Sequence, residues 1–192
     1  MEPQNKDNEI EISYPNAKTA LAEIHIAYEV ENERKRTLDG KAGAFMAANI
    51  AVLTVYIPLI PFDKMLSFFA EAGRYKVVAA TLILVVLAVG IVFSLAAFKK
   101  LADGYSNKRY RYPNVDNLLG VANTIKKYPD GATESGIVAH YHSILRGTID
   151  EPGNMKLNDE RADKIQKGIH RTVAGFCLIS FATIAIRIIM GG

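Results

Sequence analysis

The residues of this chain that could carry catalytic or metal chemistry are few and unfavourably spaced. His140 and His142 are two positions apart, so on a helix they point to different sides and make a poor two-point metal site. Cys177, the one cysteine, lies in an apolar run, where we expect it to serve in packing rather than as a nucleophile. The sequence contains no phosphate-binding glycine loop, nucleophile elbow or zinc-protease motif. We therefore expect neither an enzyme nor a bound metal or cofactor.

Basic side chains are the groups best suited to bind a ligand, because arginine and lysine hold phosphate. Between residues 105 and 112 they alternate with Tyr105, Tyr110 and Tyr112, a pattern that suits phosphates together with stacked bases. The same clusters are also explained as topology determinants attracted to anionic lipid headgroups. The candidate ligand-binding residues are Arg34, Arg36, Lys41, Lys99, Lys100, Lys108, Arg109, Arg111, Lys164, Lys167 and Arg171.

A second set of polar residues lies inside an otherwise apolar run. Asn49, Thr54 and Tyr56 fall within residues 42–62, and polar groups in hydrocarbon usually face protein or a watery path. They are our candidates for lining a pore. For Asn49 the alternative is a hydrogen bond between helices without any transport role.

Three apolar runs would position these side chains, and together they hold much of the chain's 49% hydrophobic content. The uncharged run Val77–Phe98 would form a helix of about 33 Å, close to the thickness of a bilayer's hydrocarbon core. Ala42–Phe62 and Thr172–Met190 have similar lengths, and Arg187 near the end of the last run can reach the interface. We expect an all-α membrane protein with three transmembrane helices, an amphipathic N-terminal helix and a small helical cytoplasmic segment.

Basic residues near the runs predict the orientation of the chain. They are more frequent before residue 42 and at both ends of residues 99–171 than in the connection 63–76, so the N-terminus should be cytoplasmic. Four segments result: residues 1–41, an N-terminal arm and cytoplasmic amphipathic helix; residues 42–98, a two-helix transmembrane hairpin; residues 99–171, a cytoplasmic helical region; and residues 172–192, the third transmembrane helix.

Local signals refine these segments. Asn16 is a plausible N-cap, residues 63–76 read as a short amphipathic connection, and Asn158–His170 as a helix that continues into the last run. We also predict helices at Leu118–Tyr128 and Glu134–Arg146. Small residues mark possible close approaches: Gly40 and Gly43 at a bend or packing point, and Gly90 with Ser94 as a small-xxx-small pair.

The stretch Tyr28–Gly43 contains Arg34 followed by Leu38-Asp39, Lys41 and Ala42, and it leads directly into the first apolar run. It resembles the entry of bacterial antiphage membrane effectors, a group that includes the Pycsar-type, SLATT-type and Hailong-type proteins. The resemblance implies a protein of the bacterial inner membrane controlled by a nucleotide or oligonucleotide signal that a partner nucleotidyltransferase makes. Once active, such a protein conducts ions or disrupts the membrane, and the infected cell is arrested or killed.

The leading hypothesis is therefore an oligomeric ion channel or pore effector of antiphage defence, gated by a nucleotide ligand. Three spans are too few to enclose a path comfortably, so we expect a homo-oligomer, with a tetramer as the working stoichiometry. In this hypothesis the first run lines the path and the second faces lipid. The alternative is a non-conducting membrane anchor or adaptor whose cytoplasmic helices dock a protein partner.

Overall fold

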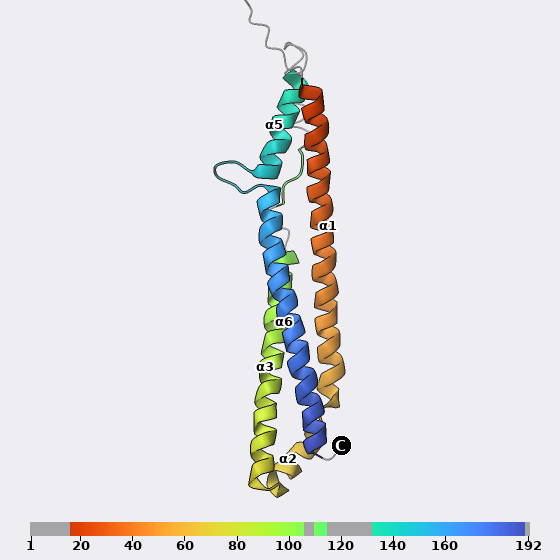
Figure 1. The fold of residues 1–192 in the computed structure, drawn as a ribbon, viewed down its shortest axis with the longest axis vertical. Coiled ribbons are helices and arrows are strands. Elements are labelled where there is room, and N and C mark those ends of the chain that lie inside the picture. The colour runs from red at the N-terminus through yellow and green to blue at the C-terminus, as the bar shows by residue number, and fades with distance from the viewer. Residues whose placement is uncertain (1–15, 106–109, 115–131, 191–192) are drawn as a thin grey trace, which may run out of the picture. The chain divides into compact units, whose positions relative to one another are not determined.

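The protein is described by a computed structural model that covers residues 16–105, 110–114 and 132–190 (Figure 1). About 88% of this part is helical, without strands, which confirms the expected all-α fold. Three helices are long and apolar enough to span a membrane. They contain the whole of the predicted run Val77–Phe98 and most of the other two, although the helix of the first run ends at Tyr56, short of the predicted Phe62, and the last helix ends at Ile189. The elements are α1 (Ala17–Tyr56), the 3-10 turn η1 (Ile57–Leu59), α2 (Phe62–Glu71), α3 (Arg74–Tyr105), α5 (Ala132–Arg146) and α6 (Asn154–Ile189).

Helix ends follow the local signals. α1 begins directly after Asn16, whose main-chain carbonyl accepts a hydrogen bond from the Ala20 N–H. It ends where Pro58, which lacks an N–H, enters the 3-10 turn. The expected connection after the first run contains α2, and the expected helix before the last run is the beginning of α6. The predicted helix Glu134–Arg146 is confirmed within α5, whereas Leu118–Tyr128 lies outside the described residues.

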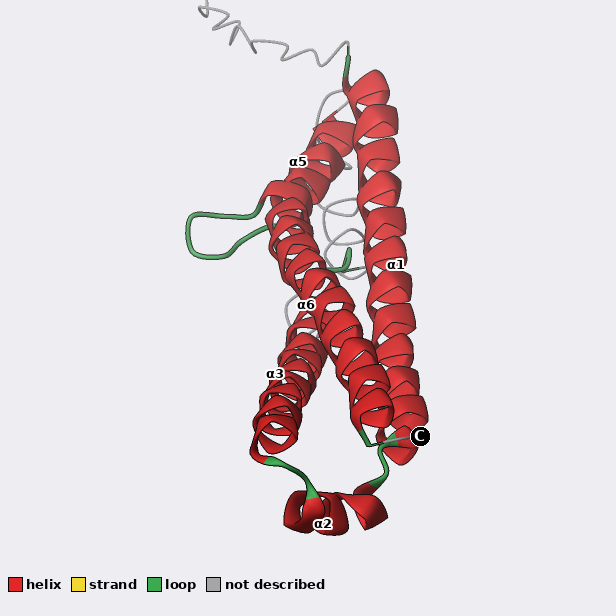
Figure 2. Cartoon of the chain, turned by 60° about the horizontal axis from the view of Figure 1, so that its bottom comes forward, coloured by secondary structure: helices red, strands yellow, loops and turns green. Residues whose placement is uncertain are grey.

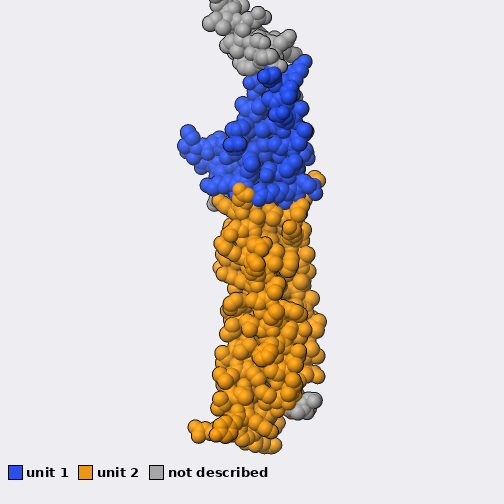
Figure 3. All heavy atoms as spheres, viewed as in Figure 1, with its two compact units in different colours: residues 1–34, 109–157 blue, residues 35–108, 158–192 orange. Residues whose placement is uncertain are grey.

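The chain divides into two compact units, which do not coincide with the four segments expected from the sequence (Figure 3). Unit 1 comprises residues 1–34 and 109–157, and unit 2 comprises residues 35–108 and 158–192. Two helices, α1 and α6, contribute residues to both units.

Unit 2 is a bundle of α1, α3 and α6, with α2 connecting the ends of α1 and α3 (Figure 2). Buried residues recur at alternating three- and four-residue spacing along α3 and α6, and at seven- and four-residue spacing in α1 from Glu31 to Asn49. This is the pattern of helices that pack at a small crossing angle. One apolar cluster contains Ile60, Leu87, Ile179, Ala182 and Ile186. Nearby, Arg187 donates a hydrogen bond from Nε to the Leu59 carbonyl at 3.0 Å, so it reaches the end of the bundle.

Small residues of α3 and α6 allow these two helices to approach closely in unit 2. A Cβ added at Gly175 would meet Ser94 Oγ at 2.9 Å and the Gly90 carbonyl at 3.1 Å. The spacing of Gly90 and Ser94 thus marks an interface inside the chain, where backbones approach closely. Gly40 and Gly43 behave differently: they lie inside the unbroken α1, and a Cβ added at either would have nothing within 4 Å, so they neither bend the helix nor pack against another helix of the same chain.

Unit 1 is built around four buried side chains from α1 and α5: Tyr28, Tyr141, Ile144 and Leu145. α5 ends at Arg146, and the next residue, Gly147, adopts φ +91°, a conformation that glycine reaches without a Cβ penalty. The following loop returns to Asn154, the first residue of α6. Within this loop the Thr148 N–H donates to the Glu151 carbonyl, and Gly147 pairs with Pro152. The connection between α5 and α6 is therefore a tight turn.

Candidate functional site

Most of the described basic candidates gather around one cross-section of unit 2. Leu38 and Ala42 of α1, Leu101 of α3 and Ile165 of α6 form a buried cluster there. The basic residues adjoin the members of this cluster in sequence, which places cations from all three helices at one edge of the apolar bundle. We call them the basic collar: Lys41, Lys99, Lys100, Lys164, Lys167 and Arg171.

Cations at such an edge have two possible phosphate partners. They can meet the headgroups of the surrounding lipid, or they can bind the phosphates of a soluble ligand. Lys167 already forms an ion pair with Asp163 at 2.7 Å, in which both side chains are more than half exposed. Because this pair is exposed, replacing Asp163 by another anion as the partner of Lys167 costs little free energy.

A partly buried ion pair lies at the same level of the bundle. The Arg161 guanidinium on α6 pairs with the Asp39 carboxylate on α1 and donates from Nε to the Gly104 carbonyl on α3 at 2.8 Å. Arg161 is only 6% exposed. One side chain thereby links all three long helices, and its Nη1 atom is buried without a hydrogen-bond partner. We call this arrangement the Asp39–Arg161 clasp.

Sequence reasoning alone does not find this clasp. In the sequence, Arg161 is one of several basic residues in the predicted helix before the last apolar run. Asp39 is one residue of the motif before the first run, and nothing in the sequence links the two. The structure accounts for that motif physically: Leu38 and Ala42 are buried, Asp39 holds Arg161, and Lys41 is exposed in the collar. The signal present in the sequence is one carboxylate beside a predicted membrane boundary rich in cations.

The remaining basic candidates are distributed elsewhere. Arg34 contacts Glu31 at 3.5 Å, Arg36 is exposed on α1, and Lys108 and Arg109 lie outside the described residues. Arg111, in unit 1, forms an ion pair with Glu151. The structure therefore does not bring all the candidate ligand-binding residues together in one place.

Arg111 belongs to an extended segment held by Asn154. The Asn154 side chain accepts from the Arg111 N–H at 3.0 Å and donates to the Arg111 carbonyl at 2.8 Å, so it pairs with this backbone as a neighbouring strand would. The rings of Tyr110 and Tyr112 lie 5.5 Å apart. Within the described residues, Tyr110, Arg111 and Tyr112 of the alternating run therefore pack and pair within unit 1, although Tyr112 remains more than half exposed.

Tyr28 of α1 is buried in unit 1. Its ring meets that of Tyr141 edge-on at 5.2 Å. Burial raises the pKa of the Tyr28 phenol from 10.0 to about 12, with smaller contributions from Tyr110 and Tyr141. The phenol is consequently neutral over the physiological range and acts in packing.

The three candidate pore-lining residues face different surroundings. Asn49 is 2% exposed and donates from Nδ2 to the Ser94 carbonyl at 2.7 Å. This is the hydrogen bond between helices that the sequence offered as the alternative to a pore-lining role. Tyr56 packs edge-on against Phe176 with ring centroids 5.8 Å apart. Thr54 is exposed on α1, and its hydroxyl donates to the Ile50 carbonyl. Within one chain, therefore, these residues do not share a path.

The outward faces of the three long helices differ in side-chain size. α3 and α6 expose many large apolar side chains, among them Leu82, Val85, Val92, Phe181 and Ile184, whereas α1 exposes only Ile50 and Val55 over its part of unit 2. Over the same bundle α1 exposes a row of small residues at alternating four- and three-residue spacing: Gly40, Ala44, Ala47, Ala51 and Thr54. We call this row the small face of α1. Large apolar residues suit lipid, whereas small ones let membrane helices approach one another.

Other chemistry finds little support in the described part of the chain. It contains no group of three or more His, Cys, Asp or Glu residues able to hold a metal ion. Cys177 is exposed on α6 rather than packed inside the chain, which corrects the expectation from the sequence. No protein family, characterised protein or solved structure matches this chain.

Proposed function

We propose that this chain is an oligomeric ion-conducting effector of the bacterial inner membrane, gated by a nucleotide or oligonucleotide. In this proposal a partner nucleotidyltransferase makes the signal, the collar cations bind its phosphates, and ion flux arrests or kills the infected cell. The N-terminus and the collar lie on the cytoplasmic side. The nature of the signal follows from the resemblance of Tyr28–Gly43 to antiphage effectors, since the chain itself offers only phosphate-binding chemistry.

The observation that supports this proposal most is the continuity of α1 and α6. Each helix passes from a polar, charged stretch into an apolar one without a break. The Asp39–Arg161 clasp joins them beside the collar. A ligand that prefers one arrangement of the collar would therefore shift the helices that cross the membrane, which is the requirement for gating.

The small face of α1 supports assembly through this helix. The interior of unit 2 in one chain is filled by buried side chains at the contacts between α1, α3 and α6, among them Ala42, Ala97, Ile179 and Ala182. A conducting path would therefore run between copies, at an axis bounded by α1. Of the candidate pore-lining residues, Thr54 is the one whose exposure suits this position.

A second function, the non-conducting anchor or adaptor, is favoured by the same filled interior and by the interhelical bond of Asn49. In that case the spans only hold the chain in the membrane, and unit 1 docks a protein partner.

Ion flux in liposomes distinguishes the two functions. Purified protein is reconstituted with a fluorescent reporter of ion leakage and exposed to cyclic mononucleotides, cyclic dinucleotides and short DNA oligonucleotides. The channel proposal expects flux that at least one of these probes switches on or off. A correctly assembled oligomer that conducts under none of them would leave the anchor as the better account.

A further inference from the structure

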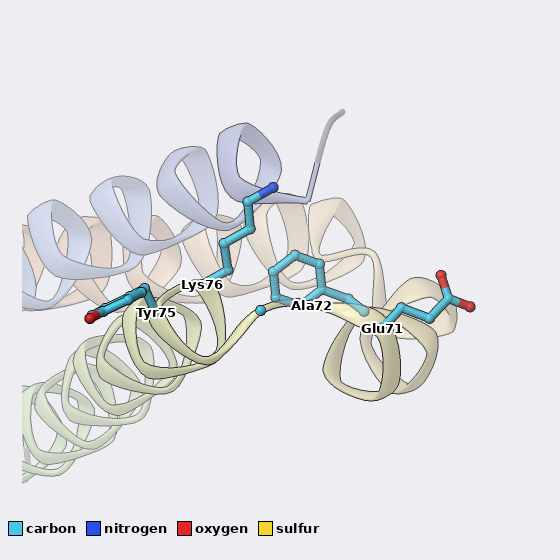
Figure 4. Close-up of a pocket in the computed structure, with 6 residues that line it drawn as sticks. Glu71, Ala72, Tyr75 and Lys76 are labelled. Carbon is cyan, nitrogen blue, oxygen red and sulfur yellow. The ribbon is translucent and has the colours of Figure 1, made fainter.

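A hollow of about 470 Å³ lies at the turn between α2 and α3, but its charges do not converge. Figure 4 shows Glu71 and Lys76 of its lining extending in different directions. We therefore infer no ligand at this turn. The Arg161 guanidinium differs, because it presents several hydrogen-bond donors from one buried point.

Arg161 has more donors than the structure satisfies. Its Nε donates to the Gly104 carbonyl at 2.8 Å and its Nη2 donates to the Asp39 carboxylate. Nη1, in contrast, has no hydrogen-bond partner in the part of the chain that the structure describes. The Arg161 side chain is only 7% exposed, and a buried donor without an acceptor is unfavourable. The guanidinium can therefore hold an oxyanion more completely than Asp39 does.

The Asp39 carboxylate marks the position that such an oxyanion would take. Its side chain is 28% exposed, so this position borders the surface of unit 2. Lys164 lies three residues after Arg161 on α6, a spacing that places both cations on one side of the helix. Lys41 of the collar is two residues after Asp39 on α1. Anions are thus attracted to the edge of the bundle where the carboxylate lies.

We propose that Arg161 is a phosphate-binding residue and that Asp39 is its tethered competitor. A phosphate that is not attached to α1 can accept from Nη1 and Nη2 together, the bidentate geometry that guanidinium groups favour. When it displaces the Asp39 carboxylate, α1 is released from α6 beside the collar. This inference deepens the proposed gating and rests on the proposed function for the source of the phosphate, a soluble nucleotide or oligonucleotide.

Inorganic phosphate is the probe, added to the delipidated protein in detergent. Thermal unfolding is compared in sodium phosphate and in sodium chloride of equal ionic strength, which removes the effect of screening. We expect Asp39→Ala to bind phosphate about tenfold more tightly than the wild type, because the competitor is gone. Phosphate should therefore raise its melting temperature by more than that of the wild type. Asp39→Asn keeps the side-chain volume and should respond in the same direction, even if Asp39→Ala does not fold.

Asp103→Ala is the matched control. It removes the same charge from an exposed position of α3 that forms no ion pair with Arg161 in the described part of the chain. Its response to phosphate should equal that of the wild type. The double variant Asp39→Ala/Arg161→Leu removes both charges of the clasp, a replacement that proteins often tolerate. It should fold and lose the phosphate-dependent rise.

Three results would overturn the proposal. The first is a phosphate response of the Asp39 variants no larger than that of Asp103→Ala, and the second is a full response in the double variant. The third is stabilisation by phosphatidylglycerol in mixed micelles but not by inorganic phosphate, which would assign Arg161 to lipid headgroups. Nucleotide-controlled flux without the phosphate response would remove this site and leave the channel, whereas the response without flux would leave the site and remove the channel.

Discussion

Arg161 of α6 forms an ion pair with Asp39 of α1, although 122 positions separate them in the sequence. The same guanidinium donates to the Gly104 carbonyl of α3. Arg161 is buried, and the Asp39 carboxylate compensates its positive charge. The clasp therefore fixes the mutual position of the three long helices at the collar.

Removing the carboxylate should destabilise the bundle strongly. Asp39→Ala leaves a buried guanidinium without a counter-charge, which we expect to cost about 2–4 kcal/mol. Asp163→Ala removes the same charge from an exposed pair with Lys167 and should cost less than about 1 kcal/mol. Thermal unfolding in detergent compares the two variants. Similar melting temperatures for both would mean that the clasp contributes nothing particular to the fold.

The glycines of unit 2 should differ sharply in their tolerance of alanine. Gly175→Ala forces a Cβ against Ser94 and the backbone of Gly90, so we expect a loss of about 1–3 kcal/mol. Gly43→Ala meets open space inside a helix and should be neutral or stabilise by up to about 1 kcal/mol. The pair is measured by the same unfolding experiment, and a harmless Gly175→Ala would contradict the close α3–α6 contact.

Titration of Tyr28 should make the stability of the protein fall at high pH. The unfolded chain loses the phenol proton near pH 10, whereas the folded chain keeps it until about pH 12. Between these values the folded state holds more protons, so the free energy of unfolding decreases as the pH rises. The two-unit difference corresponds to about 3 kcal/mol.

Denaturant unfolding of wild type and Tyr28→Phe at pH 9 and pH 11.5 isolates this contribution. Phenylalanine cannot ionise, so the variant should lose less stability over this interval than the wild type. The other tyrosines and lysines are common to both proteins and cancel in the comparison. Parallel pH dependences would show that the Tyr28 phenol is not held neutral by burial.

Bulk on the small face of α1 should prevent assembly. Ala47→Leu places a large side chain on this face, whereas Ala88→Leu makes the same change on the exposed surface of α3. We expect the first variant to be smaller than the wild type in size-exclusion chromatography with light scattering, and the second to be unaffected. If both assemble normally, copies of the chain do not meet through α1.

Substitutions at Asn49 and Thr54 distinguish a residue that packs inside the chain from one that lines the conducting path. Asn49→Leu removes a buried hydrogen bond and should cost about 1 kcal/mol while leaving the flux per assembled oligomer unchanged. Thr54→Leu changes an exposed side chain and should reduce the flux without affecting stability. Altered ion selectivity in a stable Asn49→Leu protein would instead place Asn49 at the path.

The long helices could be predicted because their signals are local and extensive. An apolar run such as Val77–Phe98 identifies a span without any knowledge of its neighbours. The partners of individual side chains could not be predicted: nothing near Asn49 indicates that it bonds to Ser94, and nothing near Arg161 indicates Asp39. Both contacts depend on the register of helices that are distant in sequence.

The same limit applies to the candidate site. Counting cations finds all six residues of the collar, but it also includes Arg111, which is paired within unit 1 with Glu151 and Asn154. Gly90 and Ser94 carry a genuine packing signal, whereas Gly40 and Gly43 face open space. Sequence spacing predicts that small residues permit an approach, and only the fold shows which helix approaches.

The most direct test of this account is ion flux through liposomes that contain wild type, Ala47→Leu or Ala88→Leu protein, measured with and without the nucleotide probes. We predict that wild type and Ala88→Leu conduct in a manner that one of the probes controls, and that Ala47→Leu does not conduct. An assembled wild-type oligomer that leaves the liposomes sealed under every probe would contradict the account.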